Sequence, residues 1–253
     1  MKTAEDIGTN RTGIATSPLE APQVIAGAEQ GGSSPGDESA LAAARTAYVR
    51  EAEPIGSVPP PVSLKGAVKT VAQALKGEKA SVFIDKLGER LAFERAGVRL
   101  YALAMVKAET GPRWDGAPSV ADLAGIQRDE LEHFGLLQEC AKELGADPTA
   151  MTPSADVAVN LSKGIPAVLA DPRSDLRHCL EGLLVAELSD NAGWEALASL
   201  ARELKQDRMA EQFERALEQE QDHLRRVKEW LREGVASVAT GRNAEKGEQP
   251  RAH

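Results

Sequence analysis

Six residues of this chain form a repeated pattern whose side chains could bind metal ions together. Along the sequence the pattern reads Glu, Glu-x-x-His, Glu, Glu-x-x-His, and its members are Glu94, Glu130, His133, Glu187, Glu220 and His223. A glutamate and a histidine three residues apart lie one turn apart on one face of a helix, so an oxygen and an imidazole nitrogen can point at the same position. This is the ligand set of a dinuclear metal site inside a four-helix bundle.

The charge of these residues also indicates metal. Four buried carboxylates are very unfavourable unless positive charge lies close to them. Two divalent cations would balance the four negative charges. Mixed carboxylate and imidazole ligands favour iron or manganese, so we expect two iron ions, with manganese as the alternative.

The positions of the six residues within their helices support metal binding over two alternatives. In these the side chains are either solvated or buried in the core with other hydrogen-bond partners. Steps of three and four residues keep one stripe of a helix facing its neighbours, and each candidate ligand falls on such a stripe. The stripes are Ile84, Leu87, Leu91, Glu94, Val98, Tyr101, Met105; Leu123, Ile126, Glu130, His133, Leu137, Cys140, Leu144; Leu176, Leu180, Leu183, Glu187, Asp190, Trp194, Leu197, Ala201; and Met209, Phe213, Ala216, Glu220, His223, Val227, Trp230. The nearby Glu89, Glu132 and Glu218 fall off the stripes and are expected to face water.

The pattern resembles the ferritin-like superfamily of di-iron and di-manganese carboxylate proteins, which includes rubrerythrins, bacterioferritins and manganese catalases. The stretches LAFERAGVRLY, DELEHFGLLQECAKELGADP and EQEQDHLRRVKEWL are similar to metal-binding helices of rubrerythrin, and the resemblance covers about residues 81–234. It implies that Glu94 and Glu187 are terminal ligands, that Glu130 and Glu220 bridge the two metals, and that His133 and His223 bind one metal each.

The sequence departs from rubrerythrins in its cysteines. Rubrerythrins usually carry a second iron site of paired C-x-x-C motifs, whereas Cys140 and Cys179 stand far apart in this sequence. We read both as small buried residues, and we expect a separate, unidentified electron donor.

Other polar residues near the pattern are secondary candidates. Asp190, one turn after Glu187, is a possible seventh metal ligand, an acceptor that orients a histidine, or a solvated residue at the end of the bundle. Tyr101 and Trp194 follow the lone glutamates by two turns and should wall the metal cavity. Tyr101 is the candidate catalytic residue, because it could hydrogen-bond to a ligand or donate an electron. His178 falls on the opposite face from Glu187 and is not expected to be a ligand.

The function predicted from this site is that of a di-iron oxidoreductase. The expected substrates are dioxygen or hydrogen peroxide, in a peroxidase-like or ferroxidase-like reaction. A di-manganese catalase and a non-catalytic metal-binding or iron-buffering protein are the alternatives. The last alternative is a purely structural bundle that binds no metal, although apolar residues at the six positions would then make the bundle more stable.

Composition limits the partners. The net charge of −9 argues against nucleic acid. The sequence has no apolar stretch of membrane length and no secretion signal at its N-terminus, so we expect no membrane partner. Two unpaired cysteines fit a reducing, cytoplasmic compartment. Dimers are common for bundles of this type, which makes a homodimer a candidate assembly.

The predicted fold class is all-α, a ferritin-like antiparallel four-helix bundle with a long crossover between its second and third helices and a flexible N-terminal extension. Residues 1–60 should be disordered or weakly helical, with one helix in ESALAAARTAYVREAE. Residues 61–236 should form the bundle with a preceding amphipathic helix, and residues 237–253 a disordered tail. The crossover, Gly145 to Arg173, should contain a short helix broken near Gly164 and Pro166. Ser119 and Ser174 are predicted helix caps.

Overall fold

The computed structural model describes residues 21–31, 37–59 and 78–241, which form eight helices and no strand. The chain divides into two units, residues 1–53 and 54–253. The first unit contains α1 (Ala21–Gln30) and α2 (Glu38–Glu51), neither of which buries a residue. Asp37 caps α2 by accepting the Ala40 N–H at 3.0 Å. The amphipathic helix predicted before the bundle covers residues 63–78 and, apart from Glu78, falls outside the described residues, so the predicted domain boundaries stay predictions.

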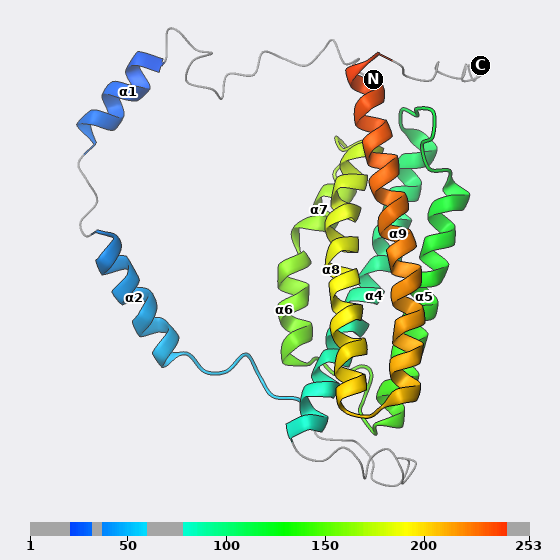
Figure 1. Cartoon of the computed structure of the whole chain (residues 1–253). Coiled ribbons are helices and arrows are strands. Elements are labelled where there is room, and N and C mark those ends of the chain that lie inside the picture. Colours follow the sequence, from blue (N-terminus) through cyan, green and yellow to red (C-terminus); the bar gives the residue numbers. More distant parts are fainter. Residues whose placement is uncertain (1–20, 32–36, 60–77, 242–253) are drawn as a thin grey trace. The chain divides into compact units, whose positions relative to one another are not determined.

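Four long helices form the second unit (Figure 1). They are α4 (Glu78–Thr110), α5 (Val120–Glu143), α8 (Leu176–Glu203) and α9 (Asp207–Ala239). α4 and α5 pack as one antiparallel hairpin and α8 and α9 as a second, and α4 also packs against α8 and α5 against α9. The predicted antiparallel four-helix bundle is confirmed.

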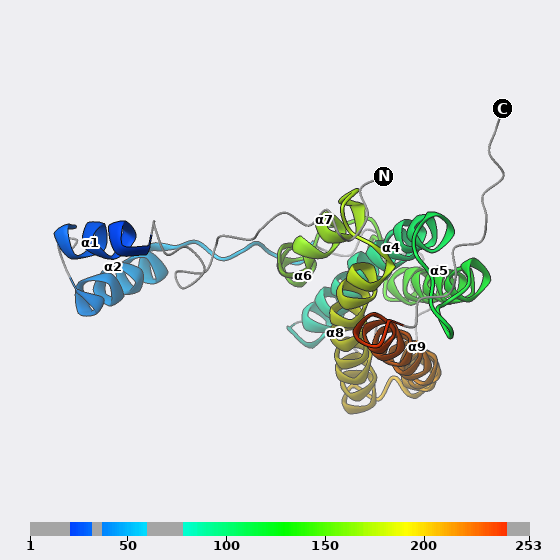
Figure 2. The ribbon, with the colours of Figure 1, turned by 90° about the horizontal axis from the view of Figure 1, so that it is seen from above.

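The crossover between the hairpins contains two helices, α6 (Pro153–Ser162) and α7 (Gly164–Ala170). α5 and α8 run in the same direction, so the chain must return along the bundle before α8 begins (Figure 1). α6 and α7 make this return outside the four long helices, against α4 and α8 (Figure 2). Ser154 fixes the start of α6 to α4, because its backbone N–H and its hydroxyl donate to the Asp85 carboxylate at 2.9 and 2.6 Å.

Side-chain caps begin α5 and α8. The Ser119 hydroxyl accepts the Asp122 N–H, and the Asp122 carboxylate accepts the Ser119 N–H, a reciprocal capping box. The predicted cap at Ser174 is wrong by one residue. Asp175 caps α8 because its carboxylate accepts the backbone N–H groups of Arg177 and His178.

The apolar stripes are buried as predicted in α5 and α8, and nearly so in α9, where Trp230 is half-buried. In α4 the stripe differs after Glu94: Val98 and Met105 are half-buried, while Gly97 and Ala104 are buried. α4 is also covered by α6 and α7, which widens its buried side. The core consists of two apolar clusters, one around Phe83, Leu137 and Phe213 and one around Leu123, Leu180 and Val227. In every long helix the candidate ligands come between these two clusters.

None of the helices in the described ranges is long and apolar enough to cross a membrane.

Candidate metal centre

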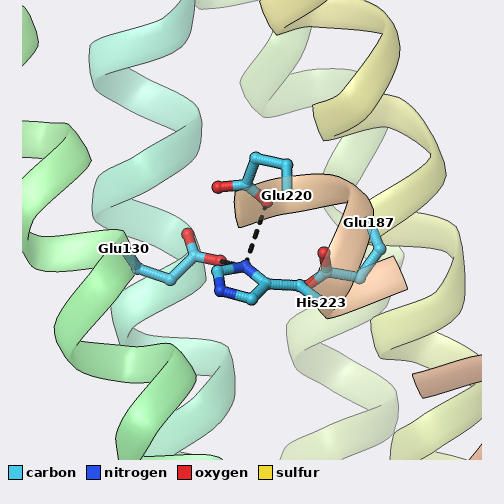
Figure 3. Close-up of side chains that lie close together, drawn as sticks. All are labelled: Glu130, Glu187, Glu220 and His223. Carbon is cyan, nitrogen blue, oxygen red and sulfur yellow. Dashed lines mark hydrogen bonds and ion pairs between the residues drawn. The ribbon is translucent and has the colours of Figure 1, made fainter. Parts of the chain in front are cut away.

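The bundle brings all six predicted ligands together at its centre. Each is at most 3% exposed, namely Glu94, Glu130, His133, Glu187, Glu220 and His223. Their donor atoms form overlapping groups within 4.8 Å of one another, of which one contains Glu130, Glu187, Glu220 and His223. Figure 3 shows these four side chains pointing toward one another from α5, α8 and α9. A second group contains Glu94, His133 and Glu220.

Glu220 lies between the two histidines. Its Oε1 is 2.6 Å from His133 Nδ1, and its Oε2 is 3.2 Å from His223 Nδ1. The cluster therefore has two halves that share this carboxylate. We call the half with Glu94 and His133 position 1 and the half with Glu187 and His223 position 2. Glu130 Oε1 approaches position 2, 3.9 Å from His223 Nδ1.

The residues fit a pair of cations, because several buried donor atoms have no hydrogen-bond partner in the protein. Among the six ligands they are Glu94 Oε2, His133 Nδ1, Glu187 Oε2 and Glu220 Oε1, and Asp190 Oδ1 is a further such atom, although it is ion-paired with Arg90. His133 Nδ1 and Glu220 Oε1 are close, but their geometry is not that of a hydrogen bond. Buried polar atoms without partners are costly and uncommon. Four of them facing one another are explained if they share metal ions.

The pKa values of the glutamates reflect the same crowding. Burial, and then the neighbouring Glu94, raises the pKa of Glu130 well above its usual value. Burial and the charge of Glu220 raise the pKa of Glu187 to about 8. Burial alone would also raise the pKa of Glu220, but the adjacent imidazoles of His133 and His223 bring it down to about 2. Without cations, these carboxylates compete for the little positive charge that the histidines offer.

Each histidine has a second partner on the facing helix. His133 Nε2 is 3.0 Å from Gln219 Oε1, and His223 Nε2 is 3.1 Å from Asp129 Oδ2. These acceptors hold the proton on Nε2, which leaves Nδ1 to face the carboxylates. The sequence analysis did not identify Asp129 or Gln219. The sequence does carry one signal for these two residues, because each directly precedes the glutamate of a Glu-x-x-His pair.

Arg90 is the other functional residue that the sequence analysis missed. Its guanidinium is buried and donates from Nη2 to Glu94 Oε1 at 2.6 Å. The same nitrogen forms an ion pair with Asp190 of α8. Arg90 lies one turn before Glu94 on α4, so it reaches the same layer of the bundle.

The three secondary candidates all contact the cluster. Asp190 is buried, with one oxygen within 4.8 Å of oxygens of Glu94, Glu130 and Glu220, and it is paired with Arg90. The Tyr101 hydroxyl donates to Glu187 Oε1, and the Trp194 Nε1–H donates to Glu94 Oε1 at 2.9 Å. Tyr101 and Trp194 thus wall the cluster and also bind its ligands.

The remaining candidates lie away from the centre. The side chain of His178 is 53% exposed and paired with Asp175 at the start of α8. Cys140 and Cys179 are buried free thiols, as predicted. Of the off-stripe glutamates, Glu132 and Glu218 are exposed, whereas Glu89 is half-buried and paired with Lys86.

No family model matches this chain, and no curated protein does. Among solved structures, the chain is similar to a ferritin-like, diiron-carboxylate protein from Bacillus anthracis. The two share 19% identity with a TM-score of 0.46, over 62% of this chain and 99% of that one. At this level the likeness adds no argument. The bundle topology and the buried carboxylate–histidine cluster of this chain are themselves the features that the resemblance to the ferritin-like superfamily implies.

Proposed function

We propose that the centre binds two iron ions, one at each position, and that the loaded protein reduces hydrogen peroxide or dioxygen in a peroxidase-like or ferroxidase-like reaction. The observation that carries the proposal is the place of Glu220. Its two oxygens face two histidines, and four donor atoms of the cluster, including its own Oε1, have no hydrogen-bond partner. This arrangement supports two adjacent cations that would share the Glu220 carboxylate.

The charges of the cluster balance for two divalent cations. The four glutamates contribute four negative charges, and the ion pair of Arg90 with Asp190 cancels within itself. We therefore propose that Asp190 pairs with Arg90 beside the site and does not bind a metal ion directly. The alternative is that Asp190 is a metal ligand, in which case Asp190→Asn should lose a metal ion. If Asp190 only pairs with Arg90, the variant should retain both ions.

The chain supplies orientation, a dry environment and a hydrogen-bond donor. Two ferrous ions would supply the two electrons that, with two protons, convert hydrogen peroxide to two waters. Tyr101 is fully buried, and both burial and the charge of Glu187 raise its pKa well above its usual value. Its hydroxyl therefore stays protonated and remains a donor to Glu187. Trp194 and the apolar clusters on both sides exclude bulk water from the ligands.

The proposal needs a source of electrons for repeated turnover. This sequence carries no C-x-x-C pair that could hold a second iron centre, so we propose a separate reductant. A ferroxidase would instead release ferric iron and need no reductant.

The test is an anaerobic titration with ferrous iron followed by hydrogen peroxide, monitored by the near-ultraviolet absorption of ferric iron. The proposal predicts two irons bound per chain and one peroxide consumed for two irons oxidised. Glu130→Gln should impair this reaction, whereas Glu132→Gln, a change of the same kind at an exposed site two residues away, should not. Oxygen release by the manganese-loaded protein would favour a catalase, and iron binding without oxidation would favour a buffering role.

A further inference from the structure

The two halves of the metal centre have different surroundings. We propose that they bind metal unequally, with position 2 tighter than position 1, and that Arg90, Asp129 and Gln219 are the positioning residues that set the difference. This inference rests on the proposed function, since it requires that the cluster hold two metal ions.

At position 1, hydrogen bonds from the surrounding groups occupy one oxygen of the glutamate ligand. Glu94 Oε1 accepts hydrogen bonds from the Arg90 guanidinium at 2.6 Å and from the Trp194 indole at 2.9 Å. These two hydrogen bonds occupy Glu94 Oε1 and make it a weaker metal ligand, although Asp190 balances the charge of Arg90. Of the two Glu94 oxygens, Oε2 alone is without a hydrogen-bond partner.

The histidine of position 1 has a neutral outer partner. His133 Nε2 donates to the amide oxygen of Gln219, 3.0 Å away. An amide fixes the orientation of the imidazole but adds no negative charge behind it. Both ligands of position 1 are therefore weakened relative to a site with anionic support.

At position 2, the surrounding groups support the ligands. His223 Nε2 faces the Asp129 carboxylate at 3.1 Å. A carboxylate behind a metal-binding imidazole makes the imidazole a stronger donor. Glu187 accepts a bond from the neutral hydroxyl of Tyr101. Within the part of the chain that the structure describes, no arginine or lysine hydrogen-bonds to Glu187 or His223.

The two outer partners occupy equivalent places, which makes the difference a matter of residue type. Asp129 directly precedes Glu130, and Gln219 directly precedes Glu220. Each reaches across the bundle to the histidine of the other Glu-x-x-His pair. A carboxylate in one place and an amide in the other give the two positions unequal support, and Arg90 acts on position 1 in the same direction.

The experiment is a calorimetric titration of the full-length, metal-free protein with Mn²⁺. Free Mn²⁺ is followed by electron paramagnetic resonance. Wild type should bind two ions in steps whose Kd values differ by about 10–100-fold, the usual effect of an outer partner on metal affinity. His133→Ala should retain the tight step, and His223→Ala should lose it.

Exchanging the outer partners tests their roles. Asp129→Asn should weaken the tight step about 10-fold or more and leave the weak step unchanged, and Gln219→Glu should tighten the weak step. The double variant Arg90→Gln with Asp190→Asn removes an ion pair without leaving a buried charge, and it too should tighten the weak step. Asp222→Asn, at an exposed aspartate beside His223, is the matched control and should change neither step.

The outcomes separate this inference from the proposed function. Two indistinguishable steps in wild type, or a tight step that survives in His223→Ala, would overturn the ranking while leaving a dinuclear site. If Asp129→Asn weakens both binding steps equally, Asp129 has only a structural role. Its assignment as the positioning residue of position 2 would then be overturned. A wild-type protein that binds no Mn²⁺ or Fe²⁺ would overturn both proposals.

Discussion

Replacing Gly97 with alanine should disturb the metal centre from a helix that contributes a different ligand. Gly97 lies in α4 directly against the side chain of Glu130 from α5. A methyl group there would lie 2.8 Å from the Glu130 carboxylate carbon and collide with its Oε2. Carbon atoms in contact are normally about 3.5–4.0 Å apart. The carboxylate would therefore have to retreat by about 1 Å.

The effects on stability and on metal binding should separate. Overpacking a core costs about 1–3 kcal/mol, and replacing a helix-interior glycine with alanine returns about 1 kcal/mol. The free energy of unfolding of the metal-free protein should therefore fall by about 0–2 kcal/mol. Metal affinity should fall more clearly, by about 10–100-fold, because a proposed bridging carboxylate is displaced.

The assay combines urea unfolding of the metal-free protein with the Mn²⁺ titration. Gly135→Ala in α5 is the matched control, because nothing lies within 4 Å of its added methyl group. It should raise the free energy of unfolding by about 1 kcal/mol and leave metal binding unchanged. Two ions bound by Gly97→Ala with wild-type affinity would refute the proposed place of Glu130 in the site.

Four further predictions follow from the site and its supporting helices. Glu130→Ala and Glu220→Ala should each bind fewer than two metal ions, and wild-type stoichiometry in both variants would rule out their bridging roles. Mn²⁺ at 100 times its Kd should add about 2.7 kcal/mol per site and raise the Tm by about 10–20 °C for a chain of this size, whereas a chelator should reverse the shift. Ser119→Ala should cost about 1 kcal/mol through loss of the α5 cap. The hydrogen bond from the Ser119 hydroxyl lowers the pKa of Asp122, so the stability that this carboxylate contributes is present above its unfolded pKa and is lost as the pH falls through its folded pKa. The difference between wild type and Asp122→Asn, followed by urea unfolding, should therefore shrink below about pH 4.

The bundle could be predicted from the sequence because helical periodicity is a local property. The stripes of α5 and α8 are buried at every predicted position. The shift in α4 from Val98 to Gly97 and from Met105 to Ala104 could not be predicted. It depends on which neighbours cover α4, and both the Glu130 carboxylate and the crossover helices contribute.

The six ligands of the candidate site could be predicted from the sequence for the same reason. The six ligands fall on the stripes, so their meeting at one level follows from register. The outer partners required knowledge of which helices face each other. Asp129 and Gln219 lie one residue off the stripes, and their histidines are on the other hairpin. Arg90 would be read from sequence as one of many arginines on a polar face, and its burial appears only when Asp190 is brought against it.

The most direct test of the account is elemental analysis of the protein purified under mild, chelator-free conditions. It should find about two iron ions per chain, and Glu220→Ala should retain fewer. A wild-type protein without any transition metal, whose Tm does not change when iron is added, would contradict the claim that these six residues form a metal site.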